Sequence, residues 1–91
     1  MKLNYKQLDI PSFYKLLDIK SYSIVIKYII IDIIEQNNGA KIMCNFNNGC
    51  KYTALVFNEK HYNQEINHIK QLVYNYLENP PQKVNLITKS W

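Results

Sequence analysis

The sequence predicts a small α+β domain in which an antiparallel β-meander packs on an amphipathic helix. Apolar residues between Glu59 and Glu78 recur at the 3-and-4 spacing of one helical face. Upstream, two Asn-Asn-Gly triplets separate stretches rich in β-branched and aromatic residues, a pattern typical of hairpins. Because 91 residues suffice for one hydrophobic core and not for two, we expect a single domain over residues 1–91.

The first expected element is a short helix from Pro11 to Ile19. Proline is favoured in the first turn of a helix, and Asp9 could cap that turn. The inward-facing residues of this helix would be Phe13, Leu16 and Leu17.

Three strands are expected next, namely Ile24 to Gln36, Ala40 to Phe46 and Lys51 to Phe57. Two-residue loops at the triplets would pair Gln36 with Lys41 and Phe46 with Lys51. The first strand is long compared with the usual five or six residues. Read as a helix, residues 21–36 would make the chain a winged helix-turn-helix, the alternative fold; the β-branched residues of this segment favour the strand.

A long helix from Glu59 to Glu78 follows, with Asn58 as its cap. Asn79 and the prolines after it should end the helix, since proline lacks the next hydrogen-bond donor. A last strand is expected from Lys83 to Thr88, so that the element order is αβββαβ.

The expected registers divide the sheet into two faces. The face that the long helix should cover carries Ile29, Ile31, Ile33, Ile42, Cys44, Phe46, Leu55 and Phe57. The second face would be apolar and aromatic, as interfaces are, unless the N-terminal segment folds over it. With two aromatic anchors from outside the sheet, the predicted interface comprises Tyr28, Ile30, Met43, Tyr52, Val56, Tyr74 and Trp91.

The residues that could carry chemistry do not form a recognisable motif. Five residues separate Cys44 from Cys50 and six separate His61 from His68, whereas paired zinc ligands usually lie two to four residues apart. The two histidines are expected on the outward side of the helix. Both glycines lie in the turns, which leaves no phosphate-binding loop. We therefore expect no catalytic residue, no metal and no cofactor.

The net charge and the amino-acid composition bear on whether the partner is a nucleic acid or a protein. The net charge of +4 comes from 11 lysines without any arginine, whose bidentate fork most nucleic-acid readers use. Asn, Lys, Ile and Tyr fill 44 of the 91 positions, and their codons are rich in A and T. An AT-rich genome, such as that of a phage or a mobile element, accounts for both features.

The longest apolar stretch is interrupted by Lys27 and Asp32, so no membrane span is expected. The first residues do not resemble a secretion signal, and we expect a cytoplasmic protein. The predicted function is non-enzymatic binding of a host protein, such as inhibition of a defence nuclease, or self-association into a homodimer. The alternative is a nucleic-acid binder, either a winged-helix regulator or a sheet whose Tyr28 and Tyr52 stack on single-stranded bases.

Overall fold

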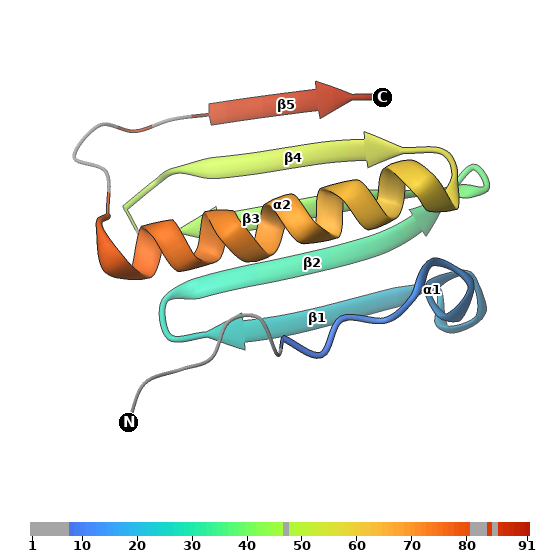
Figure 1. Ribbon diagram of the computed structural model, residues 1–91, viewed down its shortest axis with the longest axis horizontal. Coiled ribbons are helices and arrows are strands. Elements are labelled where there is room, and N and C mark those ends of the chain that lie inside the picture. Colours follow the sequence, from blue (N-terminus) through green and yellow to red (C-terminus); the bar gives the residue numbers. More distant parts are fainter. Residues whose placement is uncertain (1–7, 47, 81–83, 85) are drawn as a thin grey trace.

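Two helices and five strands make up the described part of the chain. The structure, a computed structural model, describes residues 8–46, 48–80, 84 and 86–91 (Figure 1). The elements, in chain order, are α1 (Phe13–Ile19), β1 (Ser21–Ile26), β2 (Ile29–Gln36), β3 (Gly39–Phe46), β4 (Lys51–Val56), α2 (Glu59–Glu78) and β5 (Leu86–Ser90). The α+β fold class is therefore confirmed, with one strand more than expected.

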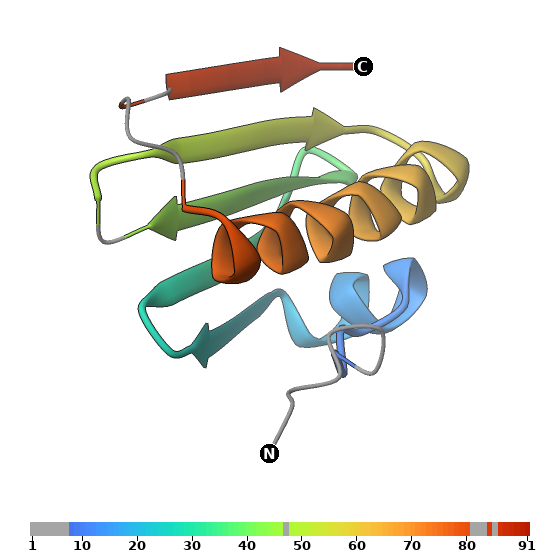
Figure 2. The same cartoon turned by 60° about the vertical axis from the view of Figure 1, so that its left-hand side comes forward.

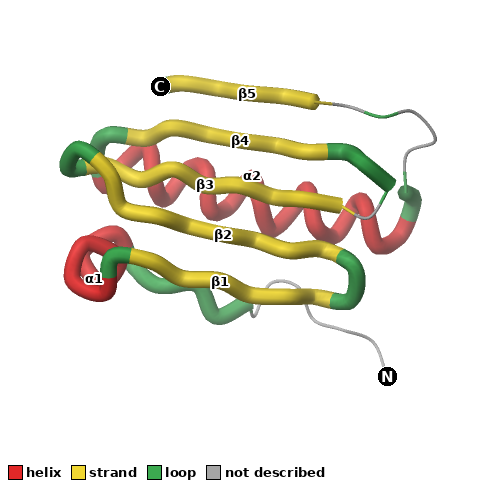
Figure 3. The backbone as a smooth tube through the Cα atoms, turned by 180° about the vertical axis from the view of Figure 1, so that it is seen from behind, coloured by secondary structure: helices red, strands yellow, loops and turns green. Residues whose placement is uncertain are grey.

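The five strands form one sheet in the order β1-β2-β3-β4-β5. The first four strands are antiparallel to their neighbours, and β5 runs parallel to β4. Helix α2 lies across one face of this sheet, and α1 lies beside one end of α2 (Figures 1 and 2). Seen from behind, the strands lie in front of α2, and neither helix covers them (Figure 3).

The expected long strand is a hairpin of β1 and β2. Ile26 pairs with Ile29, so Lys27 and Tyr28 form a two-residue turn with φ of 54° at Lys27. Such turns normally contain glycine, asparagine or aspartate, and this one has none of them, so the sequence does not reveal it. The helical alternative for this region, and with it the winged helix-turn-helix, is wrong because residues 21–26 and 29–36 are paired strands.

The turn between β2 and β3 is formed by Asn37 and Asn38. Their φ values of 52° and 63° are those of a type I′ turn, which asparagine tolerates better than most residues. Gln36 consequently pairs with Gly39 and not with Lys41. The difference of two residues leaves the expected faces of β2 and β3 unchanged.

The connection between β3 and β4 is one residue longer than expected. The Phe46 N–H donates to the Cys50 carbonyl at 3.0 Å, and Asn45, instead of Phe46, pairs with Lys51. A register change of one residue moves every side chain of a strand to the other face. The expected orientation of β4 is therefore wrong, and its buried, helix-facing residues are Tyr52, Ala54 and Val56.

Helix α2 begins and ends where the sequence predicts. The Asn58 side chain caps it by accepting a hydrogen bond from the His61 N–H at 2.9 Å, as expected. The helix packs on the sheet through an apolar stripe of Tyr62, Ile66, Ile69 and Val73. Each of these residues was expected on that face.

Helix α1 is two residues shorter than expected, because it begins at Phe13. Its cap is Ser12, whose hydroxyl accepts from the Lys15 N–H at 3.3 Å, and not Asp9. The Phe13 ring packs against the Tyr62 ring of α2, with 5.5 Å between the ring centroids.

Strand β5 covers Leu86–Ser90, so it extends beyond the expected end at Thr88. The expected start at Lys83 lies outside the described residues. Within the described residues, neither helix has a stretch that is long and apolar enough to cross a lipid bilayer.

Candidate binding surface

The face of the sheet opposite α2, here called the open face, is covered by neither helix (Figure 3). The alternation of each strand assigns side chains to it. They are Ser21, Ser23, Val25, Ile30, Asp32, Ile34, Gln36, Lys41, Met43, Asn45, Lys51, Thr53, Leu55, Leu86, Thr88 and Ser90.

Large apolar side chains on the open face are exposed to solvent. Val25 and Ile30 are paired neighbours on β1 and β2, and they are 64% and 42% exposed. Ile34 is exposed further along β2, and Leu86 is exposed on β5. Met43 and Leu55 are half-buried between them. Exposed apolar side chains gathered on one face are typical of an interaction site.

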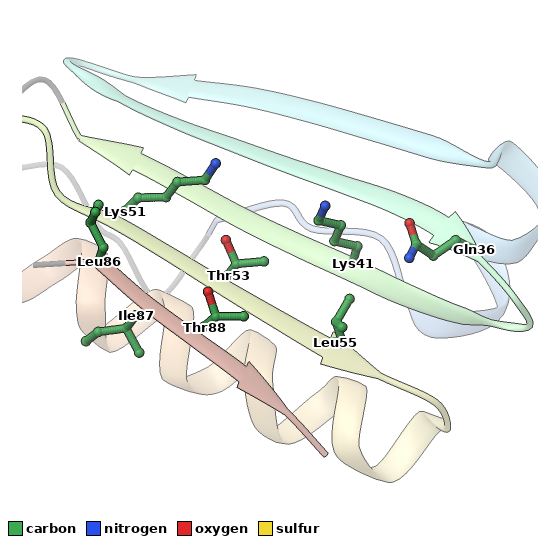
Figure 4. Close-up of a pocket in the computed structure, with 8 residues that line it drawn as sticks. All are labelled: Gln36, Lys41, Lys51, Thr53, Leu55, Leu86, Ile87 and Thr88. Carbon is green, nitrogen blue, oxygen red and sulfur yellow. The ribbon is translucent and has the colours of Figure 1, made fainter.

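A groove of about 440 Å³ lies in the open face over β3, β4 and β5 (Figure 4). Thr53 and Thr88 are neighbours in the pairing of β4 with β5 and lie in the middle of the groove. Residues from four strands line it: Gln36, Lys41, Lys51, Thr53, Leu55, Leu86, Ile87 and Thr88. None of these residues is acidic, so the charge of the groove is positive.

Only two of the predicted interface residues, Ile30 and Met43, lie on the open face. Tyr52 and Val56 are buried under α2, as a result of the changed register of β4. Tyr28, in the first hairpin turn, is half-buried against the core, and its hydroxyl donates to the Tyr76 carbonyl at 2.9 Å.

The other two predicted residues lie elsewhere. Tyr74 is exposed on α2, and Trp91 is packed beside α2. The open-face residues that the sequence analysis missed are Val25, Leu55 and Leu86. Val25 would have been found if β1 had been separated from β2, because it then alternates with Ile24 and Ile26.

The N-terminal segment does not cover the open face in the described residues. The Tyr62 hydroxyl of α2 donates to the Pro11 carbonyl at 2.6 Å, and the Tyr22 hydroxyl donates to the Asp9 carbonyl. Both contacts hold residues 9–11 on the α2 side of the sheet. Residues 1–7 lie outside the described part.

A second cluster of polar groups surrounds Glu65, whose side chain is 1% exposed. The Tyr52 hydroxyl donates to Glu65 Oε2 at 2.8 Å, and the Trp91 Nε1–H donates to Oε1 at 2.9 Å. Lys89 Nζ lies 3.3 Å from Oε1, and His68 Nδ1 lies 3.9 Å from Oε2. We call these five residues the Glu65 cluster.

The Glu65 cluster connects β5 to α2. The Trp91 ring stacks on His61 at 4.5 Å between centroids, and Lys89 Nζ lies 3.9 Å from the Trp91 ring centroid. His68 therefore belongs to the cluster, and His61 lies beside it through Trp91. The sequence analysis expected both histidines on the outward side of α2; the His68 side chain is 47% exposed although it contacts Glu65. Sequence analysis also missed Glu65, although this acid interrupts the apolar stripe between Tyr62 and Ile66.

The arrangement of the Glu65 cluster is that of a structural contact. Both carboxylate oxygens already accept hydrogen bonds from side chains of the protein itself, which satisfies a buried acid. In the residues that the structure describes, histidine, cysteine and acidic side chains do not come together in a group that could hold a metal ion.

Burial also raises the pKa values of ionisable groups around the cluster. Burial, reinforced by the charges of Glu65 and Asp32, raises the pKa of the Cys44 thiol to about 12. Burial and the hydrogen bond to Glu65 raise the pKa of Tyr52 as well. Burial raises the pKa of Tyr62 to about 12.

These pKa shifts predict a loss of stability in alkaline solution. The unfolded chain releases these protons at lower pH than the folded chain, so the stabilisation is complete below about pH 9 and declines as pH rises towards 12. Each such group lowers the free energy of unfolding as pH rises between its pKa in the unfolded chain and its higher pKa in the folded chain. Urea unfolding between pH 8 and 11 measures the slope, which should be smaller in Cys44→Ala and Tyr52→Phe. A free energy of unfolding that stays constant to pH 11 would contradict these shifts.

The fold and the site together define a small α+β domain with one helix-covered and one open sheet face. Comparisons with protein-family models, with curated proteins and with solved structures found no match.

Proposed function

We propose that this domain is a non-catalytic binding protein that contacts another protein through its open face. The observation that carries the proposal is the uncovered sheet face itself, with exposed Val25, Ile30 and Ile34 beside a cationic groove. Apolar side chains next to polar ones are the composition of ordinary protein interfaces.

The same face offers little to nucleic acid. The aromatic residues of the strands, Tyr22, Phe46 and Tyr52, belong to the α2 side of the sheet. Within the described residues, the strands therefore supply no ring on the open face on which a base could stack. The chain also lacks arginine. A protein partner is therefore the better-supported proposal.

The amino-acid composition, rich in residues with A- and T-rich codons, supports a more specific proposal about the partner. An AT-rich coding sequence is compatible with a phage or a mobile element. We therefore propose a host protein as the partner, with inhibition of a defence nuclease as the activity. Self-association through the open face would make a homodimer, which light scattering of the purified protein would detect.

Site-specific photo-crosslinking in host cells tests the proposal. With a benzophenone amino acid in place of Ile30, we expect a covalent adduct with a protein partner, because Ile30 lies on the open face and is exposed. The same amino acid in place of Gln71, which is exposed on α2, is the matched control and should give no adduct. The adducts are counted on a denaturing gel and identified by mass spectrometry.

A third crosslinking position distinguishes binding through the open face from binding through the outer side of α2. Tyr74 is exposed on α2 and was predicted as an interface residue from the sequence. Adducts from position 74 without adducts from position 30 would refute the open face as the binding surface. Adducts to nucleic acid from position 30 would refute the choice of a protein partner.

A further inference from the structure

The groove in the open face has the chemistry of a site for an acidic ligand. Lys41 and Lys51 line it, and neither forms an ion pair with any described residue. Asp32, the acidic residue among the described residues of the open face, pairs with Met43 and does not line the groove. Two ammonium groups without an acidic partner favour an anion that comes from outside the chain.

The spacing of the two lysines indicates the shape of the ligand. Lys41 pairs with Leu55, and Lys51 precedes Leu55 by four positions on β4. At about 3.3 Å per residue, the two lysines are separated by about 13 Å along the strand direction. Acidic side chains four positions apart in an extended peptide have the same separation, and both lie on one side of the peptide.

The middle of the groove suits the residues between those two acids. Thr53 is only 7% exposed and lies beside Thr88, so the middle of the groove carries two hydroxyl groups (Figure 4). Leu55 and Leu86 provide apolar contacts at opposite ends of the groove. Small or β-branched residues would fit between the two acids.

We propose that the groove binds an extended acidic segment of the partner protein, with carboxylates at positions i and i+4 that contact Lys41 and Lys51. The inference rests on the proposed function, since the groove is part of the open face. The inference adds to the proposed function the charge and the conformation of the partner's segment, and the spacing of its acidic residues.

Fluorescence anisotropy with two synthetic peptides tests the spacing. Both are labelled ten-residue peptides of threonine and valine, which favour extended structure, and both contain two glutamates. In the first peptide the glutamates are four positions apart; in the second they are five apart and lie on opposite sides. We expect the first peptide to bind at least threefold more tightly, and binding to weaken as NaCl rises from 20 to 200 mM.

Charge-neutralising variants test the site. Lys41→Gln combined with Lys51→Gln should weaken binding of the first peptide about fivefold, the effect of losing two partly exposed ion pairs. Lys15→Gln combined with Lys60→Gln removes the same charge from the helices and should leave the affinity unchanged. Circular dichroism of both variants checks that the fold is retained.

Three results would overturn the inference. They are equal affinity for both peptides, equal weakening by both pairs of substitutions, and tighter binding of a mixed-sequence oligonucleotide through the same two lysines. If one of them occurs while crosslinking at position 30 still captures a protein, the acidic segment is refuted and the proposed function stands. If the peptide binds as expected and position 30 captures no protein, the proposed function fails and the groove remains an acidic-peptide site.

Discussion

Replacing Glu65 with alanine is expected to lower the free energy of unfolding by about 2–3 kcal/mol and to release β5 from α2. The substitution removes the acceptor of the buried Tyr52 hydroxyl and of the Trp91 indole N–H. Most of the loss comes from the Tyr52 hydroxyl, which remains buried without that partner. Lys89 contributes less, because its side chain is 43% exposed and is solvated when the carboxylate is removed.

Two measurements separate loss of the contact from general unfolding. Urea denaturation gives the change in stability, and the emission of Trp91, the single tryptophan of the chain, reports on the cluster directly. In Glu65→Ala the emission should shift to longer wavelength at urea concentrations where α2 is still folded. Glu65→Gln keeps an acceptor oxygen at the same length and should cost less. Unchanged stability and unchanged emission in Glu65→Ala would show that the cluster does not hold β5.

Replacing Gly39 with valine is expected to cost about 3 kcal/mol or more, or to prevent folding. A Cβ atom at position 39 would lie 2.2 Å from the Val56 carbonyl oxygen, a backbone atom that cannot rotate away. The strands β3 and β4 would have to separate where Ala40 pairs with Val56. Chemical denaturation and circular dichroism would measure the loss.

Gly49→Ala serves as the comparison, because substitution at Gly49 is strained by the backbone angle and not by a steric clash. Its Cβ would meet only the Val84 side chain, at 3.6 Å, but its φ of 90° is unfavourable for alanine. The expected cost is about 1–2 kcal/mol. A cost for Gly39→Val no larger than for Gly49→Ala would contradict the close approach of β3 to Val56.

Short sequence patterns were sufficient to predict the elements that are stabilised by contacts between neighbouring residues. The Asn58 cap predicted the start of α2, and Asn79 with the prolines after it predicted the end. The Asn-Asn-Gly triplets marked both later connections of the meander. The Lys27–Tyr28 turn was not predicted because a positive φ is uncommon at lysine. The pairing of β1 with β2 offsets the conformational cost of that φ.

The residues of the open face and of the Glu65 cluster were harder to predict, because they depend on one loop length and on contacts between distant segments. A loop of two residues instead of three placed Tyr52 and Val56 on the wrong face of the sheet. Glu65 and Trp91 are 26 residues apart in the sequence, and neither carries a local sign that they meet. Ile30 and Met43 were placed correctly because the register of β2 and β3 differed from the expected one by an even number.

The 47–49 connection between β3 and β4 also has a consequence for how this chain can evolve. Surface connections ordinarily tolerate inserted and deleted residues. Here the gain or loss of a single codon would exchange the two faces of β4, so that Thr53 and Leu55 would face α2 in place of Tyr52 and Ala54. Related genes that keep this architecture should therefore differ in this connection by even numbers of codons.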